Sequence, residues 1–256
     1  MTETINYANG IPTWLDLMTP DPEAARKFYG QLFAWVFDVG GPESGHYAMC
    51  LARGKTAAGM GQMPKGAPFP SAWTCYFATD NVDAAVKRVR DNGGQVMMEP
   101  MDVMTAGRMA IAIDPTGGAF GFWQARDHKG AQARGEHGAM AWHELMTRDL
   151  GKARDFYAKV LEVEMSKMDA PMEYYVGQKN GEMHFGLMAI PNEVPKEVPA
   201  HWLNYFRVDD TNATLAQLSK LGGKVVNPAM DSPHGRWAIA SDPFGASFAV
   251  IQPPAK

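Results

Sequence analysis

The amino-acid sequence predicts an α+β protein of two tandem domains, each a pair of βαβββ units. The first observation is a repeat: residues 14–29 (WLDLMTPDPEAARKFY) and 142–157 (WHELMTRDLGKARDFY) share nine of sixteen residues. The second is that the repeat continues, since Gly107-Arg108 recurs as Gly235-Arg236 and Asp114-Pro115 as Asp242-Pro243. The third is that strand-like and helix-like patterns follow the same order in each half. A duplication of half the chain accounts for all three.

The first half contains the expected elements in turn. Alternating residues over 13–19 predict a strand, and Asp21-Pro22 predicts the cap and first position of a helix that runs to about Trp35. A second helix is predicted over 81–92, ended by two glycines. The other strands are predicted at 46–52, 56–63, 73–79, 95–98, 108–113 and 119–124, the last two joined by a turn that starts at Asp114.

The second half repeats this order, with Asp149 as a helix cap, a turn at 177–181, a helix over 210–221 and a turn from Asp242. We therefore predict one domain over 1–125 and another over 138–256. The segment 126–137 is polar, contains glycine and lacks apolar periodicity, which predicts a linker.

Composition excludes several classes of protein. The 24 Lys and Arg residues against 28 Asp and Glu residues give a net charge of −4, which is no footprint for nucleic acid. No apolar run is long enough to span a membrane, and the start of the chain lacks a signal-peptide pattern. Two cysteines cannot form a disulfide framework or a four-cysteine zinc site. We expect a soluble, cytoplasmic protein with a small-molecule ligand and no nucleic-acid or membrane partner.

The doubled βαβββ pattern, with Phe-Tyr in the first helix and Asp-Pro-x-Gly before the last strand, resembles the vicinal oxygen chelate superfamily. That group includes glyoxalase I, extradiol dioxygenases and the bleomycin- and fosfomycin-resistance proteins. The chain is similar, from Pro12 to Pro253, to the tandem-domain subgroup described as lactoylglutathione lyase-related, which includes a mycobacterial antigen of similar length. The resemblance implies that the eight strands of each copy curl into an open cup with the helices outside. It does not specify an activity, because one fold hosts many chemistries.

The resemblance also implies four metal-ligand positions in each cup. They fall on Trp14, Gly59, Thr74 and Gly121 in copy one, and on Trp142, Gly186, Leu203 and Ala249 in copy two. A divalent metal needs lone pairs from imidazole, carboxylate or thiolate, and Trp, Gly, Leu and Ala supply none. We therefore predict no metal and no other cofactor.

The side chains that alternate into the cups favour an apolar or aromatic ligand. A tryptophan at the first ligand position, with Gly121 or Ala249 opposite, predicts a flat aromatic wall beside a void. The predicted substrate-binding residues are Trp14, Tyr76, Arg108, Trp123, Trp142, His201, Tyr205 and Arg236.

Asp16 and Glu144 occupy equivalent positions, so each cup is expected to hold one carboxylate. Such a group, desolvated beside a tryptophan, can act as an acid or a base, which makes both residues catalytic candidates. The alternative is a structural hydrogen bond or ion pair, for which Arg108 and Arg236 are the natural partners. Either arginine could instead bind an anionic group of the ligand.

A displaced metal site is the alternative to a metal-free cup. Glu144, His184 and His201 each lie two residues from a ligand position, on the same strand face, and this set would suit Fe(II), Mn(II) or Zn(II). His143 has the opposite parity and is expected to pack toward the helices. Cys50 and Cys75 have no counterparts in copy two and are expected to be buried, inert thiols.

Three functions stay open. The first is a metal-independent protein that binds or sequesters a small molecule. The second is a lactoylglutathione lyase-related lyase or isomerase that acts on a small carbonyl compound with Glu144 or Asp16 as base; the missing ligands weigh against it, because glyoxalase chemistry stabilises an enediolate on a metal. The third is a non-catalytic interaction protein. We expect a monomer or a homodimer, since two copies in one chain can complete the pairing that single-copy relatives achieve as dimers.

Overall fold

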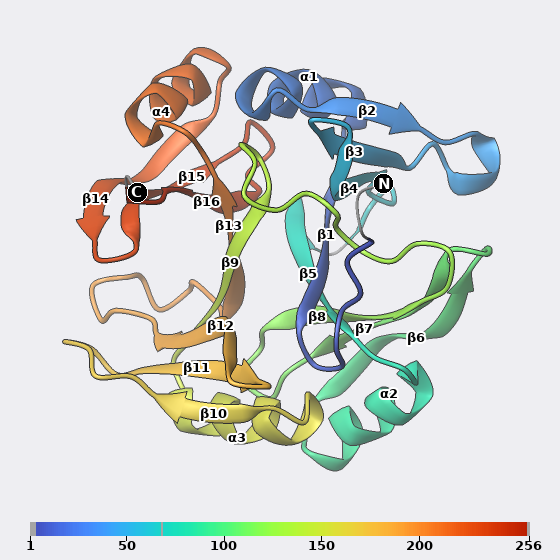
Figure 1. Cartoon of the computed structure of the whole chain (residues 1–256). Helices are drawn as coiled ribbons and strands as arrows, with labels where there is room; N and C mark the ends of the chain where they lie inside the picture. The colour runs from blue at the N-terminus through green and yellow to red at the C-terminus, as the bar shows by residue number, and fades with distance from the viewer. Residues whose placement is uncertain (1–3, 68, 255–256) are drawn as a thin grey trace. The chain divides into compact units, whose positions relative to one another are not determined.

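The computed structural model describes residues 4–67 and 69–254. Within them the chain forms two mixed eight-stranded sheets and four α-helices, which confirms the predicted α+β class (Figure 1). Copy one contains β1 (Pro12–Thr19), α1 (Pro22–Phe33), β2 (Val36–Val39), β3 (Ala48–Ala52), β4 (Lys55–Gln62), β5 (Ala72–Ala78), α2 (Val82–Asp91), β6 (Gln95–Val103), β7 (Gly107–Ile113) and β8 (Ala119–Ala125). Copy two contains β9 (Met140–Thr147), α3 (Leu150–Val160), β10 (Glu164–Lys167), β11 (Tyr174–Lys179), β12 (Glu182–Ala189), β13 (His201–Arg207), α4 (Thr211–Lys220), β14 (Lys224–Ser232), β15 (Gly235–Ser241) and β16 (Ser247–Gln252).

Each sheet takes all its strands from one copy, and the two copies have the same strand order. Copy one has the order β2-β3-β4-β1-β5-β8-β7-β6, and copy two has β10-β11-β12-β9-β13-β16-β15-β14. Strands β1 and β4 pair in parallel, as do β5 and β8, whereas the sequential neighbours β2, β3 and β4 pair antiparallel. Successive side chains on these strands point to opposite faces, so the register decides which residues meet.

The observed elements differ from the predicted ones chiefly at strand β2, at the ends of β6 and α1, and at the turn predicted over 177–181, because β11 continues to Lys179. β2 was not predicted, because four residues with Val36 66% exposed show no inward apolar alternation. Strand β6 extends five residues past the predicted end at Met98, through a largely exposed stretch that contains Pro100. Helix α1 ends at Phe33, before the predicted end near Trp35, since Ala34 adopts a left-handed conformation with φ of 54°.

Side chains cap all four helices in the same way. The carboxylates or amide of Asp21, Asn81, Asp149 and Asp210 accept hydrogen bonds from the backbone N–H three residues later. This bond satisfies one of the backbone donors that a helix leaves open at its first turn, which is why these residue types mark the helix starts in the sequence.

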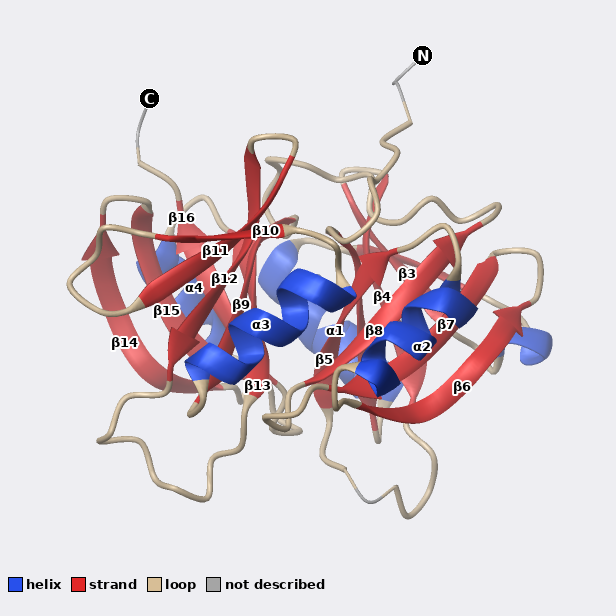
Figure 2. Cartoon of the chain, turned by 90° about the horizontal axis from the view of Figure 1, so that it is seen from below, coloured by secondary structure: helices blue, strands red, loops and turns tan. Residues whose placement is uncertain are grey.

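The chain divides into two compact units. Unit 1 comprises residues 1–14, 75–130 and 142–203, and unit 2 comprises 15–74, 131–141 and 204–256. Each unit therefore contains one βαβββ segment from each copy. In unit 1, α2 packs against β6, β7 and β8 (Figure 2). In unit 2, α4 packs against β14, β15 and β16. The domain boundaries 1–125 and 138–256 remain a prediction.

A buried tyrosine in each unit joins the two copies through hydrogen bonds. In unit 1, Tyr157 of α3 donates to Oδ2 of Asp114 at 2.7 Å and accepts from Nε1 of Trp202 at 3.1 Å. In unit 2, Tyr29 of α1 donates to Oδ2 of Asp242 at 3.1 Å and accepts from Nε1 of Trp73 at 3.0 Å. We call each set a Tyr–Asp–Trp triad; it explains why Phe-Tyr and Asp-Pro recur together in the sequence.

The predicted linker, 126–137, lies against the folded chain. Ala131 and Ala133 are buried, and the backbone N–H groups of Gln132 and Ala133 donate to the carbonyl oxygen of Thr56. Its polar composition hid these contacts, because the buried side chains are two alanines. In the described residues, no helix combines the length and the apolar character that a membrane span requires.

Candidate functional site

The glycines at the second ligand position of each copy make room for a tyrosine hydroxyl. A Cβ atom on Gly59 would lie 1.8 Å from the Tyr47 hydroxyl oxygen, and one on Gly186 would lie 1.9 Å from that of Tyr174. No side chain fits at such distances. The tyrosine hydroxyls therefore occupy the space that a side chain at Gly59 or Gly186 would need.

In copy two, the tyrosine joins a buried carboxylate and an indole. Glu144 on β9 is paired directly with Gly186 on the parallel strand β12 and is 7% exposed. The Tyr174 hydroxyl hydrogen-bonds to Glu144, and Nε1 of Trp142 donates to the same hydroxyl oxygen at 3.0 Å. Burial, followed by the negative charge of Glu144, raises the pKa of Tyr174 and keeps it protonated. We call these four residues the Tyr174 site.

Copy one repeats the arrangement with a shorter acid. Asp16 on β1 is paired with Gly59 on β4 and is 7% exposed. The Tyr47 hydroxyl donates to Oδ2 of Asp16 at 3.4 Å, a weak hydrogen bond. We call Tyr47, Asp16 and Gly59 the Tyr47 site.

A second group of aromatic rings in unit 1 surrounds His128. Its imidazole meets the indole of Trp14 edge-on, with ring centroids 4.3 Å apart, and that of Trp123 at 5.5 Å. The backbone is fixed on both sides: the N–H of His128 donates to the carbonyl of Ala106, and its carbonyl accepts from Nε1 of Trp123 at 2.9 Å. The sequence predicted Trp14 and Trp123 as substrate-binding residues, and the structure brings them together on His128.

Removal from water dominates the chemistry of His128. Desolvation lowers the pKa of the imidazole from 6.5 to about 4, so the ring is neutral at physiological pH. Its Nε2 atom is buried, and the described residues give it no hydrogen-bond partner. A buried polar atom without a partner costs free energy and is rare in folded proteins.

The predicted void beside Gly121 is wrong. Tyr76, paired with Gly121 across β5 and β8, lays its ring over that glycine, where a Cβ would lie 2.2 Å from the ring. In copy two, Ala249 is paired with the buried Tyr205 at the same register. An aromatic ring therefore stands beside the fourth ligand position of each copy.

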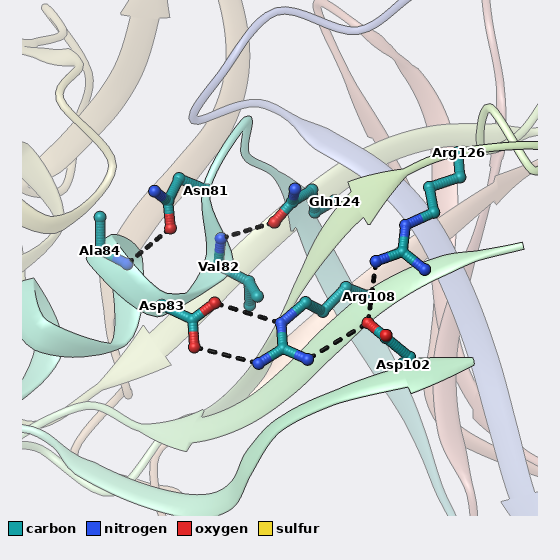
Figure 3. Close-up of polar contacts among 8 residues, drawn as sticks. All are labelled: Asn81, Val82, Asp83, Ala84, Asp102, Arg108, Gln124 and Arg126. Atoms are coloured by element: carbon teal, nitrogen blue, oxygen red, sulfur yellow. Dashed lines mark hydrogen bonds and ion pairs between the residues drawn. The ribbon is translucent and has the colours of Figure 1, made fainter. Parts of the chain in front are cut away.

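The two predicted arginines form ion pairs with acidic residues other than Asp16 and Glu144. Figure 3 shows the ion pairs of Arg108. Arg108 donates through Nε and Nη2 to the two oxygens of Asp83 at 3.1 and 3.0 Å, and through Nη1 to Asp102 at 3.2 Å. Its hydrogen bonds hold the pKa of both carboxyls below the ordinary value. In copy two, Arg236 bonds Asp231 at 2.9 Å and Asn212 at 3.2 Å. The expected pairing of Arg108 with Asp16 and of Arg236 with Glu144 is therefore replaced by bonds to the first helical turn and the neighbouring strand.

The histidines of copy two take separate positions. His201 opens β13, half-buried, with Nδ1 2.9 Å from the carbonyl oxygen of Pro199, and His184 is half-buried on β12. His143 is buried, with Nδ1 3.7 Å from Sγ of Cys75; its packing role stays a prediction. Cys50 and Cys75 are buried as expected, and burial raises the pKa of both thiols. Over residues 4–67 and 69–254, no three His, Cys, Asp or Glu side chains group as a metal site would require.

Sequence reasoning missed Tyr47, Tyr174 and His128. The tyrosines carried a readable signal, because they are 127 residues apart, the same spacing as Gly59 and Gly186. His128 carried none, because it stands in the polar segment that was predicted to be a linker.

The sheet order and the duplicated βαβββ segments define two tandem domains with a glyoxalase-type fold. The family model described as "Glyoxalase/Bleomycin resistance protein/Dioxygenase superfamily" matches residues 11–122 and again 139–250. The chain belongs to this superfamily, as its sequence resemblance implied.

Among curated relatives, the chain is 42% identical over 261 residues to "Putative glyoxylase CFP32" of Mycobacterium tuberculosis, covering 99% of this chain and 98% of the relative. It is 37% identical over 264 residues to "Anthracycline biosynthesis protein DnrV" of Streptomyces peucetius, covering 96% and 94%.

Two solved structures share the fold. The Mn(II)-bound glyoxalase from Novosphingobium aromaticivorans aligns with a TM-score of 0.66 at 16% identity, over 95% of this chain and 82% of that one. The 2,3-dioxygenase LapB from Pseudomonas sp. KL28 aligns with a TM-score of 0.66 at 10% identity, over 98% and 94%. At these identities the similarity concerns the fold alone.

Proposed function

We propose that the chain binds an apolar or aromatic small molecule through the aromatic side chains of its sheets, without a chelated metal. The observation that carries the proposal is the tyrosine hydroxyl that stands over a glycine beside a buried carboxylate, once in each copy. By the family resemblance, that glycine stands where a relative with a metal has a ligand. A neutral hydroxyl and a carboxylate offer directed hydrogen bonds to a ligand, whereas the tryptophans beside them offer flat apolar area.

The donor set supports metal independence. The first, second and fourth ligand positions hold tryptophan, glycine and glycine or alanine, none of which donates a lone pair to a divalent cation. The name of the relative DnrV supports the ligand class, because anthracyclines are polycyclic aromatic compounds. The cytoplasmic location and the monomeric or homodimeric state are part of the same proposal.

The proposal is tested with purified full-length protein by elemental analysis and by thermal-shift titration with hydroxynaphthalenes and anthraquinones. We expect less than about half an equivalent of metal per chain and a concentration-dependent rise in melting temperature with an aromatic compound. Stoichiometric metal that is lost in Glu144→Ala would overturn metal independence. Absence of stabilisation by every compound would favour the interaction protein.

A second candidate is a lactoylglutathione lyase-related enzyme. The buried Glu144, hydrogen-bonded to Tyr174, is placed as a base for a small carbonyl compound, and Asp16 is its weaker counterpart. The glyoxylase name of CFP32 favours this candidate. Turnover of the methylglyoxal–glutathione hemithioacetal that disappears in Glu144→Gln would establish it, and no turnover above the uncatalysed rate would exclude this substrate.

A further inference from the structure

The Tyr174 hydroxyl oxygen can accept one more hydrogen bond than the described residues donate to it. A tyrosine hydroxyl can donate one hydrogen bond and accept two. The indole Nε1 of Trp142 can only donate, so it uses one lone pair of the oxygen. The carboxylate of Glu144 accepts the one hydrogen bond that the hydroxyl can donate. The described residues supply no third partner, and one lone pair of the oxygen remains.

We infer that this lone pair of Tyr174 accepts a hydrogen bond from the bound molecule, so that copy two selects aromatic ligands that carry an O–H or N–H group. The inference rests on the proposed function and adds the polar group of the ligand to it. A phenol, an enol or a ring N–H can donate a hydrogen bond to this lone pair. An ether or ketone oxygen cannot, because it carries no hydrogen and its own lone pairs repel that of the tyrosine.

The selection depends on a hydroxyl that cannot turn. Gly186 forms the floor under the oxygen, and any larger residue would displace it. Trp142 and Glu144 lie two residues apart on β9 and so share one strand face, from which they fix the two other hydrogen bonds. A pre-oriented polar group discriminates strongly, since a mismatched ligand leaves a buried polar atom unpaired.

The inference concerns copy two, where the two hydrogen bonds of the tyrosine hydroxyl are defined by Trp142 and Glu144.

The test compares two probes that differ by one methyl group, 2-naphthol and 2-methoxynaphthalene, by isothermal titration calorimetry on full-length protein. Wild-type protein is expected to bind 2-naphthol about tenfold more tightly, the worth of one good hydrogen bond. In Tyr174→Phe the preference should disappear. In the matched control Tyr175→Phe it should persist, because Tyr175 is the next residue on β11, on the opposite face, and its hydroxyl bonds Glu173 and Arg154.

Glu144→Gln gives an independent measurement. A glutamine amide can donate as well as accept, so the tyrosine proton is no longer held away from the ligand and the preference for 2-naphthol should fall. Equal affinity of wild-type protein for both probes, or a preference that survives in Tyr174→Phe, would overturn the inference and leave the proposed function standing. If neither probe binds wild-type protein, both fail. If Tyr174→Phe does not fold, the wild-type and Glu144→Gln measurements still decide.

Discussion

At the scale of single residues, the site is defined by atoms that are missing as much as by atoms that are present. Gly59 and Gly186 lack the Cβ that would collide with a tyrosine hydroxyl, and Gly121 lacks the Cβ that would collide with the Tyr76 ring. The aromatic residues thus fill the space that small residues leave. The consequence is a rigid polar anchor in each copy.

Gly186→Ala should therefore damage the Tyr174 site. Its new methyl group would lie 1.9 Å from the Tyr174 oxygen, and forcing it into a packed interior costs about 1–3 kcal/mol in the free energy of unfolding. Urea denaturation measures the loss, and calorimetry with 2-naphthol should show weaker binding. Gly151→Ala is the matched control, because nothing lies within 4 Å of that position in the first turn of α3. Unchanged stability and binding in Gly186→Ala would contradict the close packing of the Tyr174 hydroxyl against Gly186.

His128 predicts a pH dependence of stability. Its folded-state pKa of about 4 lies below the ordinary value of 6.5, so between these values the unfolded chain takes up a proton that the folded chain does not. Its contribution is complete above pH 6.5 and is lost as the pH falls toward 4. Between pH 7 and pH 4.5, the urea midpoint of wild-type protein should therefore fall further than that of His128→Gln.

That comparison between two proteins is needed because other groups titrate as well. Burial raises the pKa of Asp242, so the protonation of this carboxyl stabilises the folded chain as the pH falls. This contribution is equal in both proteins and cancels from the difference between them. A difference that stays constant with pH would show that His128 titrates normally.

At the scale of elements, the two Tyr–Asp–Trp triads join helices of one copy to turns of the other. Asp114 and Asp242 each accept hydrogen bonds from backbone N–H groups of their own turn on Oδ1. The other oxygen, Oδ2, accepts a hydrogen bond from the tyrosine hydroxyl. The tyrosine in turn accepts from a tryptophan. Removal of one hydroxyl therefore disturbs three groups.

Tyr157→Phe tests this account of the triads. It leaves the Nε1–H of Trp202 and one oxygen of Asp114 without their buried partner, which should cost about 1–3 kcal/mol in the free energy of unfolding. Chemical denaturation gives the value. Tyr175→Phe, whose hydroxyl bonds charged side chains near the surface, should lose less than half as much. Equal losses in the two variants would mean that burial of the triad adds nothing.

The ion pairs of Arg108 predict a weak effect. Arg108 ties β7 to the start of α2 and to β6, and both of its acidic partners are largely exposed to water. Water and salt screen exposed ion pairs, so Arg108→Met should leave the free energy of unfolding and the affinity for 2-naphthol nearly unchanged. Calorimetry decides between the two roles that the sequence left open. A large loss of affinity for an anionic aromatic compound would restore the ligand-binding role.

How far the sequence predicts the structure depends on the range of the interactions. Helix caps such as Asp21 and Asp149 are local, and the repeat places their copies, so the elements follow from the sequence. Tyr174 lies over Gly186 only because β11 and β12 pair in one register, and a single sequence does not show that register. His128 was assigned to a linker because the segment around it is polar and lacks apolar periodicity, and its contact with Trp14, far away in the chain, is not visible in the sequence.

At the scale of the whole molecule, two copies of one sequence carry two unlike sites. Each copy holds a carboxylate against a tyrosine hydroxyl, Glu144 in copy two and the shorter Asp16 in copy one. In addition, an imidazole lies against Trp14. The two copies thus share the fold and the glycines under the tyrosine hydroxyls, whereas their polar groups differ. The proposed account gives each copy an aromatic surface and gives selectivity to the second.

The most direct test of the central claim is the affinity for 2-naphthol measured by calorimetry before and after metal is supplied. Full-length protein is dialysed against a chelator and titrated, and the titration is repeated with one equivalent of Mn(II). The account predicts dissociation constants that agree within about twofold. Binding that appears only with Mn(II), or that tightens tenfold or more with it, would contradict it.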